Sequence, residues 1–372
     1  MFSYKHYIPI LRWRAAEKGA LQNLETEDRA LITPFVELIM PQPRGDGNKT
    51  RKKTPAELLK ESIDIFLKDL PAIPSELLKY WGHETFFLDV QLLDGSIRAK
   101  SLEKILGNGK QLDILLVPLL SVIPVVGFAS DEQTRRVAVN FAKENKHGLC
   151  LRITESNLKE KSLASDVKAF IGNNSLDAKN IDLMVDFKIV DEQTSYEFLF
   201  KKINLIPHLE QWRTFIVASG AFPQDLSQFR DPGQYDIPRA DWTLWCRLSK
   251  DLKRSPSFAD YTIQHPVYLP RDSSSNPSAS IRYALEDHWV ILKGQGLRNK
   301  KGAGFKQYPA QAQLFVKQKE IFKGASFSFG DSYIAEKAKD INTKDTGNPM
   351  TWLRAGINHH LALVARQIAS AP

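Results

Sequence analysis

The sequence predicts an α/β fold, a (β/α)8 barrel of the TIM type followed by a C-terminal α+β extension that covers the barrel mouth. Short, almost continuously apolar segments recur along the first 250 residues, and segments with the apolar spacing of amphipathic helices separate most of them. Strands that are apolar on both faces belong to parallel sheets covered by helices, and eight such units match a closed barrel better than an open sheet. No glycine-rich dinucleotide fingerprint follows a strand, which also argues against an open nucleotide-binding sheet.

Apolar runs locate the predicted strands, and helical spacing with capping signals locates the helices between them. The eight predicted barrel strands are residues 7–11, 32–39, 86–90, 123–128, 148–153, 181–187, 214–220 and 242–248. Residues 54–57 (TPAE) have the form of a capping box with proline at the first helical position, and residues 130–133 (SDEQ) form a second such box. We therefore predict a barrel domain over residues 1–250.

The alternation of apolar strand segments with helical segments ends after this domain. Residues 251–372 are predicted to form an extension packed on the barrel. Its predicted elements are extended segments at 261–268, 289–293 and 325–329 and helices at 311–322 and 351–368. A separate domain is the alternative for this part of the chain.

Composition bounds the class of protein. The chain has 372 residues and a net charge of +8, which favours an anionic partner such as a nucleotide or nucleic acid. Cys150 and Cys246 lie in apolar runs, which indicates buried thiols and a reducing, cytoplasmic location. The apolar run 114–129 is too short for a membrane span, and no membrane segment is expected. The basic segment 44–53 lacks interleaved aromatic residues, so a solvated loop is favoured over a nucleic-acid-binding arm.

Polar residues at the predicted strand ends indicate where chemistry would occur, because functional groups of barrel enzymes lie at the carboxyl ends of the strands. Those residues are Glu37, Asp89, Arg152, Asp186, Ser219 and Arg247. The three carboxylates are candidate catalytic acids or bases and candidate ligands for a divalent cation such as Mg²⁺ or Mn²⁺. The two arginines are candidate phosphate-binding groups. A structural ion network that closes the barrel explains the same residues equally well.

The segment 260–296 is predicted to form a second wall of the mouth. His265 is a candidate catalytic base, although a histidine in an apolar context is more often a satisfied core residue. Arg282, Tyr283 and Lys293 are candidate phosphate-binding residues. In the helical segment 351–368, His359 and His360 point about 100° apart, so they do not suit one metal ion; one is expected to face the core and the other the mouth. Residues 327–331 (FSFGD) are expected to form a turn with an exposed acid.

Several segments together resemble the beta protein family, which is named after a protein of T-even bacteriophages. They are YIPILRWRAAEKGAL, PFVEL, FADYTIQHP, SIRYALEDHWVILKGQG, FSFGD and WLRAGINHHL, and they span nearly the whole chain. The resemblance implies a bacterial or phage cytosolic protein connected with phage–host conflict, with a protein partner in a phage-defence system as a further expectation. It assigns no catalytic residue.

Three functions are compatible with these observations. The leading hypothesis is an enzyme that acts on a nucleotide or nucleic acid at the barrel mouth, most concretely a metal-assisted phosphodiester hydrolase. The alternatives are a non-catalytic binding or sensor protein that recognises a phage component, and a DNA-binding accessory protein that uses residues 44–53. Carboxylate oxygens gathered around one solvent-facing point would favour the hydrolase, whereas carboxylates paired with arginine or lysine would favour the binding protein. The sequence leaves the oligomeric state open.

Overall fold

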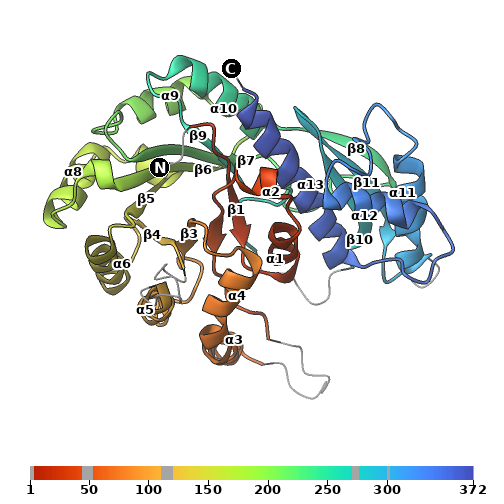
Figure 1. Ribbon diagram of the computed structural model, residues 1–372, viewed down its shortest axis with the longest axis horizontal. Coiled ribbons are helices and arrows are strands. Elements are labelled where there is room, and N and C mark those ends of the chain that lie inside the picture. Colours follow the sequence, from red (N-terminus) through yellow and green to blue (C-terminus); the bar gives the residue numbers. More distant parts are fainter. Residues whose placement is uncertain (1–3, 44–52, 110–119, 270–275, 300–301, 372) are drawn as a thin grey trace.

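A closed barrel of eight parallel strands organises the structure, a computed structural model that describes residues 4–43, 53–109, 120–269, 276–299 and 302–371. The predicted (β/α)8 barrel is confirmed (Figure 1). The barrel strands, in their order around it, are β1 (Ile8–Arg12), β2 (Phe35–Glu37), β3 (Phe86–Asp89), β4 (Val122–Gly127), β5 (Leu149–Thr154), β6 (Ile181–Ile189), β7 (Thr214–Gly220) and β9 (Ser257–Asp260). Strand β1 pairs in parallel with β9, with Ile8 opposite Ala259, and this pairing closes the barrel.

Helices separate most of the strands. In chain order they are α1 (Ala15–Gln22), α2 (Thr26–Arg29), α3 (Pro55–Asp69), α4 (Ile73–Tyr80), α5 (Arg98–Gly109), α6 (Glu132–Asn145), α7 (Glu155–Lys159), α8 (Leu163–Asn173), α9 (Tyr196–Asn204) and α10 (Ala240–Asp251). Helix α3 begins at the predicted capping box, because the Thr54 side chain accepts from the backbone N–H of Glu57 and the Glu57 carboxylate accepts from that of Thr54. The second predicted box, residues 130–133, was wrong by one residue, because the cap of α6 is Asp131, whose carboxylate accepts from the N–H of Thr134.

The extension contains a small antiparallel sheet with helices on it. Its strands, in spatial order, are β10 (Ser278–Ala284), β11 (His288–Gly296) and β8 (Gly233–Pro238). Its helices are α11 (Gln307–Phe315), α12 (Phe329–Ala338) and α13 (Pro349–Ala369). Helix α13 packs on α1 and on β10, and so lies between the barrel and the small sheet (Figure 1).

The eighth strand was predicted wrongly. Residues 242–248 belong to α10, in which Asp241, Trp245 and Leu248 are the buried positions. Their spacings of four and three residues are typical of one face of a helix. The tryptophan-rich sequence has apolar residues so close together that it resembles a continuous apolar strand. The strand that closes the barrel is β9, which follows residue 250, whereas β8 precedes it and joins the sheet of the extension. The division at residue 250 stays a prediction.

Two other expectations for the extension were wrong. Residues 325–329 were expected to be extended, but Ser328 caps α12, which begins at Phe329. Residues 261–268 contain no strand, and they form turns that follow β9. Strand β11 and helix α13 cover the predicted extended segment 289–293 and the predicted helix 351–368.

The core has three parts. The side chains inside the barrel form one cluster, which includes Phe35, Phe87, Cys150, Met184 and Tyr261. A larger cluster fills the layer between the barrel and its helices, and a third lies between the small sheet and α11 and α12. Alternate residues of each barrel strand therefore point into the barrel interior and into the layer between barrel and helices. The same alternation determines the direction of each residue at a strand end.

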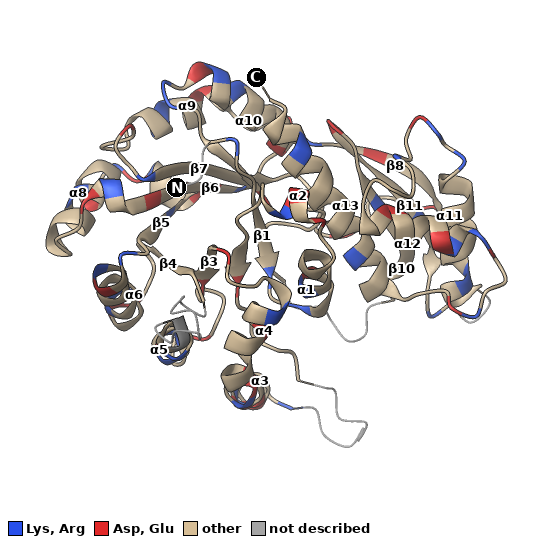
Figure 2. Cartoon of the chain, viewed as in Figure 1, with Lys and Arg blue, Asp and Glu red and all other residues tan. Residues whose placement is uncertain are grey.

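The charges and the remaining sequence expectations can be placed on this fold. Basic and acidic residues alternate along the helices in the view of Figure 2. Cys150 is buried inside the barrel and Cys246 is half-buried on α10. Within the described ranges, no helix is long and apolar enough to cross a membrane. Of the basic segment 44–53, residues 44–52 lie outside the described residues.

Candidate functional site at the barrel mouth

Strand alternation brings a ring of polar residues to the carboxyl end of the barrel interior. Phe35, Phe87, Cys150 and Met184 all face the interior. The residues two positions later therefore face the interior as well, one layer nearer the mouth. They are Glu37, Asp89, Arg152 and Asp186, and each of them is less than a tenth exposed.

The Arg152 guanidinium lies at the centre of this ring. Its Nη1 donates to Glu37 Oε1 at 2.9 Å and to Asp89 Oδ2 at 2.6 Å. Its Nε and Nη2 both donate to Asp186 Oδ2, at 3.0 and 2.7 Å. One cation thus bonds all three carboxylates that the sequence placed at the mouth. We refer to these four residues as the mouth cluster.

Tyr261 and Lys188 bond to the mouth cluster, and the sequence reasoning did not place either of them there. The Tyr261 hydroxyl donates to Asp186 Oδ2 at 2.7 Å and accepts from Arg152 Nη2 at 2.8 Å. Lys188 Nζ lies 2.8 Å from the Tyr261 hydroxyl and 3.1 Å from Asp186 Oδ2. The Lys188 side chain is 30% exposed, so it links the buried cluster to solvent.

Arg12 is a third residue that the sequence reasoning missed. It faces the interior because it follows Ile8 and Ile10 by even steps on β1. Its Nη2 donates to the carbonyl oxygens of His265 and Pro266 at 2.8 and 2.9 Å, and its Nε lies 3.8 Å from Glu37 Oε2. Arg12 therefore ties the segment after β9 to the mouth. A strand prediction one residue longer would have identified it.

The three carboxylates differ in how strongly they hold a proton. Burial acts to raise the pKa of Glu37, but the charges of Arg152, Lys188 and Arg12 outweigh it and the pKa is lowered. The pKa of Asp186 is lowered further, because Lys188 and Arg152 together overcome its burial. Burial raises the pKa of Asp89, and the attraction of Arg152 does not cancel this effect. Asp89 is therefore the member of the mouth cluster that is protonated most easily.

The other predicted site residues lie elsewhere. The ring Nδ1 of His265 lies 3.2 Å from the carbonyl oxygen of Val267, and no hydrogen bond within the described ranges joins this ring to the mouth cluster. Arg247 lies on the exposed face of α10, 3.3 Å from Glu197 and over the ring of Tyr196. Ser219 is buried but follows the interior residue Ala218, so it faces outward. None of the three extends the mouth cluster.

The predicted phosphate-binding residues of the extension separate to two faces of one sheet. Tyr283 is fully buried and donates to Asp331 Oδ1 at 2.6 Å. Arg282, one residue earlier on β10, faces the other way and donates to the carbonyl oxygen of Ile263 at 2.9 Å. Lys293 lies on β11 opposite Ser280 and faces the same side as Arg282. Arg282 and Lys293 thus remain together, whereas Tyr283 belongs to the core.

The two histidines of α13 each contact a buried carboxylate, and neither carboxylate lies at the barrel mouth. His360 Nε2 lies 2.7 Å from Asp260 Oδ2, and the Tyr7 hydroxyl donates to the other oxygen of Asp260. Asp260 follows the interior residue Ala259 and so points outward, towards α13. His359 Nδ1 lies 2.7 Å from Asp331 Oδ2. The expectations that one histidine faces the mouth and that residues 327–331 expose an acid were therefore wrong.

A further buried acid lies within electrostatic reach of Asp260 and has no hydrogen-bond partner among the described residues. Asp241 is fully buried in the first turn of α10, and neither of its carboxylate oxygens has a partner in the part of the chain that the structure describes. Burial raises the pKa of Asp241 to about 7, and Asp260 adds to this effect while Arg239 opposes it. Asp241 is thus a buried group that titrates near neutrality.

The mouth cluster does not suit a divalent cation. A hard cation needs several carboxylate oxygens around one point, and the Arg152 guanidinium already stands at the point where the three carboxylates converge. No group of three or more His, Cys, Asp or Glu side chains among the described residues is arranged to hold a metal. The arrangement is that of a buried ion network.

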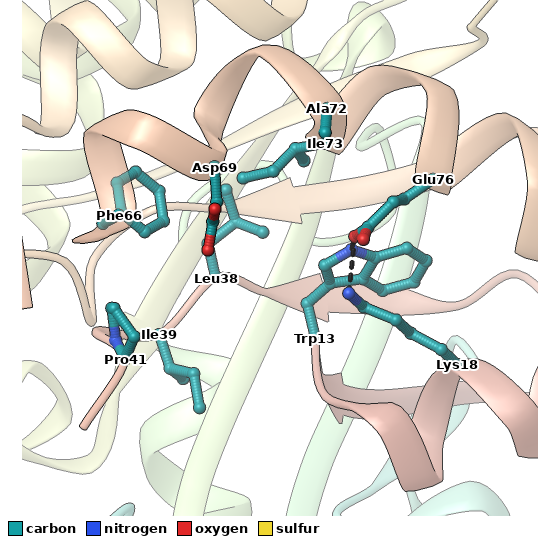
Figure 3. Close-up of a pocket in the computed structure, with 10 residues that line it drawn as sticks. All are labelled: Trp13, Lys18, Leu38, Ile39, Pro41, Phe66, Asp69, Ala72, Ile73 and Glu76. Carbon is teal, nitrogen blue, oxygen red and sulfur yellow. Dashed lines mark hydrogen bonds and ion pairs between the residues drawn. The ribbon is translucent and has the colours of Figure 1, made fainter. Parts of the chain in front are cut away.

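A small cavity lies beside the barrel, where β1 and β2 meet α3 and α4 (Figure 3). Its volume is about 320 Å³, and Trp13 and Phe66 supply part of its wall. The polar groups near Trp13 bond one another, since Glu76 Oε2 accepts from the indole N–H at 3.2 Å and from Lys18. The cavity therefore combines apolar walls with the charged side chains of Lys18, Asp69 and Glu76.

Fold and site together define a class of protein, a (β/α)8 barrel with an arginine–carboxylate network at its mouth and an α+β extension that the buried His360–Asp260 pair joins to the barrel. The chain belongs to the Beta protein family, whose sequence model matches residues 7–366. This range includes the mouth cluster and both histidine–aspartate pairs. No curated protein matches the sequence.

Proposed function

We propose that this protein binds an anionic, phosphorylated ligand without hydrolysing it, and that the mouth cluster is a structural closure of the barrel. One observation supports this most directly: Arg152 donates to Glu37, Asp89 and Asp186 at 2.6–3.0 Å. An oxygen that accepts from a guanidinium is a poor metal ligand, because a second cation would be repelled by the first. Binding is thus better supported than metal-assisted hydrolysis.

Hydrolysis by a general base without a metal has less support as well. A base must reach the attacking water by a hydrogen bond. Asp186 is fully buried and already accepts from Arg152 and Tyr261. His265 lies in the segment over the mouth, but its ring Nδ1 contacts the backbone carbonyl oxygen of Val267.

The anionic character of the ligand rests on charge. The chain carries a net charge of +8, and Lys188 is the partly exposed member of the group at the mouth. The resemblance to the beta protein family, which is named after a bacteriophage protein, supports phage–host conflict in a bacterial cytosol as the setting and a phage component as the source of the ligand. A protein partner in such a system is part of the same proposal.

The proposal is tested by assaying the purified protein for phosphodiester hydrolysis with Mg²⁺ or Mn²⁺, using bis(4-nitrophenyl) phosphate and short oligonucleotides. We expect no product and no uptake of either metal by calorimetry. Product that disappears in Asp186→Asn, but persists in the exposed control Asp64→Asn on α3, would overturn the proposal. Circular dichroism of both variants would establish that each is folded.

A further inference from the structure

The cavity of Figure 3 lies at the carboxyl ends of two barrel strands. Trp13 and Leu38, which line it, directly follow the last residues of β1 and β2. The opposite wall comes from the end of α3 and the start of α4, where Phe66 and Ile73 line it. Ligands of (β/α)8 barrels bind at this end of the strands, in the loops that lead to the helices. The cavity thus occupies a place at which this fold commonly holds a ligand.

Backbone hydrogen bonds hold one wall of the cavity to the barrel strands. The backbone N–H of Trp13 donates to the carbonyl oxygen of Glu37 at 2.9 Å, and that of Leu38 donates to the carbonyl oxygen of Asp89 at 2.9 Å. Both wall residues are therefore fixed to the strand ends that carry the mouth cluster. A wall that is already in place before a ligand arrives lowers the entropic cost of binding.

The walls of the cavity are mainly apolar. Trp13, Leu38, Phe66 and Ile73 line it, and each of them is less than a tenth exposed. The volume of about 320 Å³ lies near the lower end of the roughly 300–1,000 Å³ that ligand pockets commonly measure. The cavity therefore suits a small ligand with an apolar body.

The charged groups of the lining are acidic in excess. Lys18 carries a positive charge, whereas Asp69 and Glu76 carry negative charges, which leaves a net charge of −1. Lys18 Nζ donates to Glu76 Oε2, and the same oxygen accepts from the indole N–H of Trp13 at 3.2 Å. Lys18 and Glu76 thus neutralise each other, and the excess negative charge of the lining lies on Asp69.

Asp69 has no structural partner that would explain its charge at this place. Among the described residues its carboxylate forms no hydrogen bond or ion pair, and it does not cap the short helix η1 (Leu70–Ala72) that follows it. Asp69 is exposed, and in Figure 3 it lies on the side of Phe66, away from the bonded pair of Lys18 and Glu76. An unneutralised carboxylate beside apolar walls attracts a cation that also has an apolar part.

From these observations we infer that the cavity binds a small organic amine. The apolar body of the amine packs against Trp13, Leu38 and Phe66, and its ammonium group pairs with Asp69. The inference goes beyond the proposed function, because it assigns a second, cationic ligand to a site that does not include the mouth cluster. The two proposals can therefore fail independently of each other.

The experiment compares three ligands that share a phenyl ring on a short chain. The probe is 2-phenylethylamine, 2-phenylethanol has nearly the same shape without the charge, and 3-phenylpropionate carries the opposite charge. Binding to the full-length protein at neutral pH is measured by ligand titration followed by NMR. We expect the amine to bind about fivefold more tightly than the alcohol, the advantage that an ion pair with an exposed carboxylate can provide. The carboxylate should bind most weakly, and added salt should reduce the advantage of the amine.

Three variants locate the site. Asp69→Asn keeps the shape of the side chain without its charge, so the amine and the alcohol should bind this variant equally. Asp64→Asn changes an exposed acid on the same helix that does not line the cavity, and it should keep the preference for the amine. Ile39→Trp enlarges a half-buried residue of the lining, and it should weaken the binding of both ligands because it fills the cavity. Circular dichroism establishes that each variant is folded.

Several results would overturn the inference. They are equal binding of the amine and the alcohol to the unaltered protein, tighter binding of the carboxylate, and a preference for the amine that Asp69→Asn retains. Amine binding that a folded Ile39→Trp variant leaves unchanged would place the ligand elsewhere and would also overturn it. Asp69 is exposed, so its variant keeps the test decisive if Ile39→Trp fails to fold.

Discussion

Arg152 is a buried cation on which three acids depend. A buried charge that loses its partner has no water to replace it, so removal of one member of an ion network is costly. The Arg152 side chain is 8% exposed, and those of Glu37 and Asp186 are less exposed. The stability of the barrel mouth therefore depends on this side chain.

We expect Arg152→Met to lower the free energy of unfolding by about 3–5 kcal/mol, because it leaves the buried carboxylates without their main partner. Urea denaturation at neutral pH measures the change. Arg247→Met removes the same kind of side chain from an exposed pair and should cost less than about 1 kcal/mol. Similar costs for the two variants would show that the mouth cluster contributes little to stability.

Asp89 and Asp186 bond the same guanidinium but should respond differently to neutralisation. The pKa of Asp186 is lowered, so its ionised form is favoured, whereas burial raises the pKa of Asp89. Asp186→Asn should therefore destabilise the protein more than Asp89→Asn at pH 7, by more than about 1 kcal/mol. Urea denaturation of both variants at pH 7 gives this comparison, and the reverse order would contradict it.

Asp241 should make stability depend on pH. Burial raises its pKa to about 7, so between about pH 4 and pH 7 the folded state holds a proton that the unfolded state has released. The free energy of unfolding should then fall as the pH rises through this range, by a contribution on the order of a few kcal/mol. Asp241→Asn should flatten this part of the stability profile. An unchanged slope in denaturation experiments from pH 4 to pH 8 would refute the assignment.

Helices α12 and α13 approach each other so closely that glycine is required between them. A Cβ added at Gly330 would lie 2.1 Å from the carbonyl oxygen of Ala355 and 3.1 Å from the backbone nitrogen of His359. Gly330→Ala should therefore push α12 from α13 and cost about 1–3 kcal/mol. Thermal denaturation followed by circular dichroism measures this.

The control for that variant is Gly172→Ala on α8. A Cβ at Gly172 meets nothing within 4 Å, and alanine is the better helix former, so this variant should be neutral or stabilising by up to about 1 kcal/mol. A loss of stability there as large as at Gly330 would show that helix packing is not the cause.

Helices and strands were predicted correctly where local sequence signals were strong. The prediction failed where the apolar spacing of a helix could not be told from that of a strand. Seven barrel strands were identified because their apolar runs are short and separated by capped or amphipathic segments. Residues 242–248 failed because WTLWCRL is apolar at nearly every position, so neither period is visible without its burial pattern. Strand β9 was missed because it is only four residues long and contains Ser257 and Asp260.

The mouth cluster was predicted in part, and the missing part has a physical explanation. Glu37, Asp89, Arg152 and Asp186 were identified because each ends an apolar strand. Their mutual pairing could not be predicted, because strand order and register decide which side chains meet. Lys188 was missed because β6 continues to Ile189 with an irregular register after Asp186, and Lys188 itself has a φ of 59°. Nothing in the local sequence signals such a turn of the backbone.

Across the whole molecule, the chain passes between barrel and extension more than once. Strand β8 precedes β9 in sequence, yet β8 pairs with β11 in the extension and β9 pairs with β1 and β7 in the barrel. Helix α13 then returns from the extension to pack on α1. Neither part is a continuous piece of chain.

We therefore expect the protein to unfold as one cooperative unit. Urea transitions followed by tryptophan fluorescence and by far-ultraviolet circular dichroism should coincide, because Trp81 and Trp212 report on the barrel part and Trp289 and Trp352 on the extension. Two separated transitions would instead favour independent domains divided near residue 250.

The consecutive residues Asp260 and Tyr261 have a consequence for folding fidelity. Tyr261 belongs to the barrel interior, where it bonds Asp186, and Asp260 belongs to the outer layer, where it bonds His360 and Tyr7. A slip of β9 by one residue would exchange their faces, placing a carboxylate inside the barrel and a phenol outside it. Both errors would bury polar groups without their partners. A barrel closed with β9 in the wrong register is thus disfavoured on both faces of this strand. Such misfolded forms should therefore be sparsely populated.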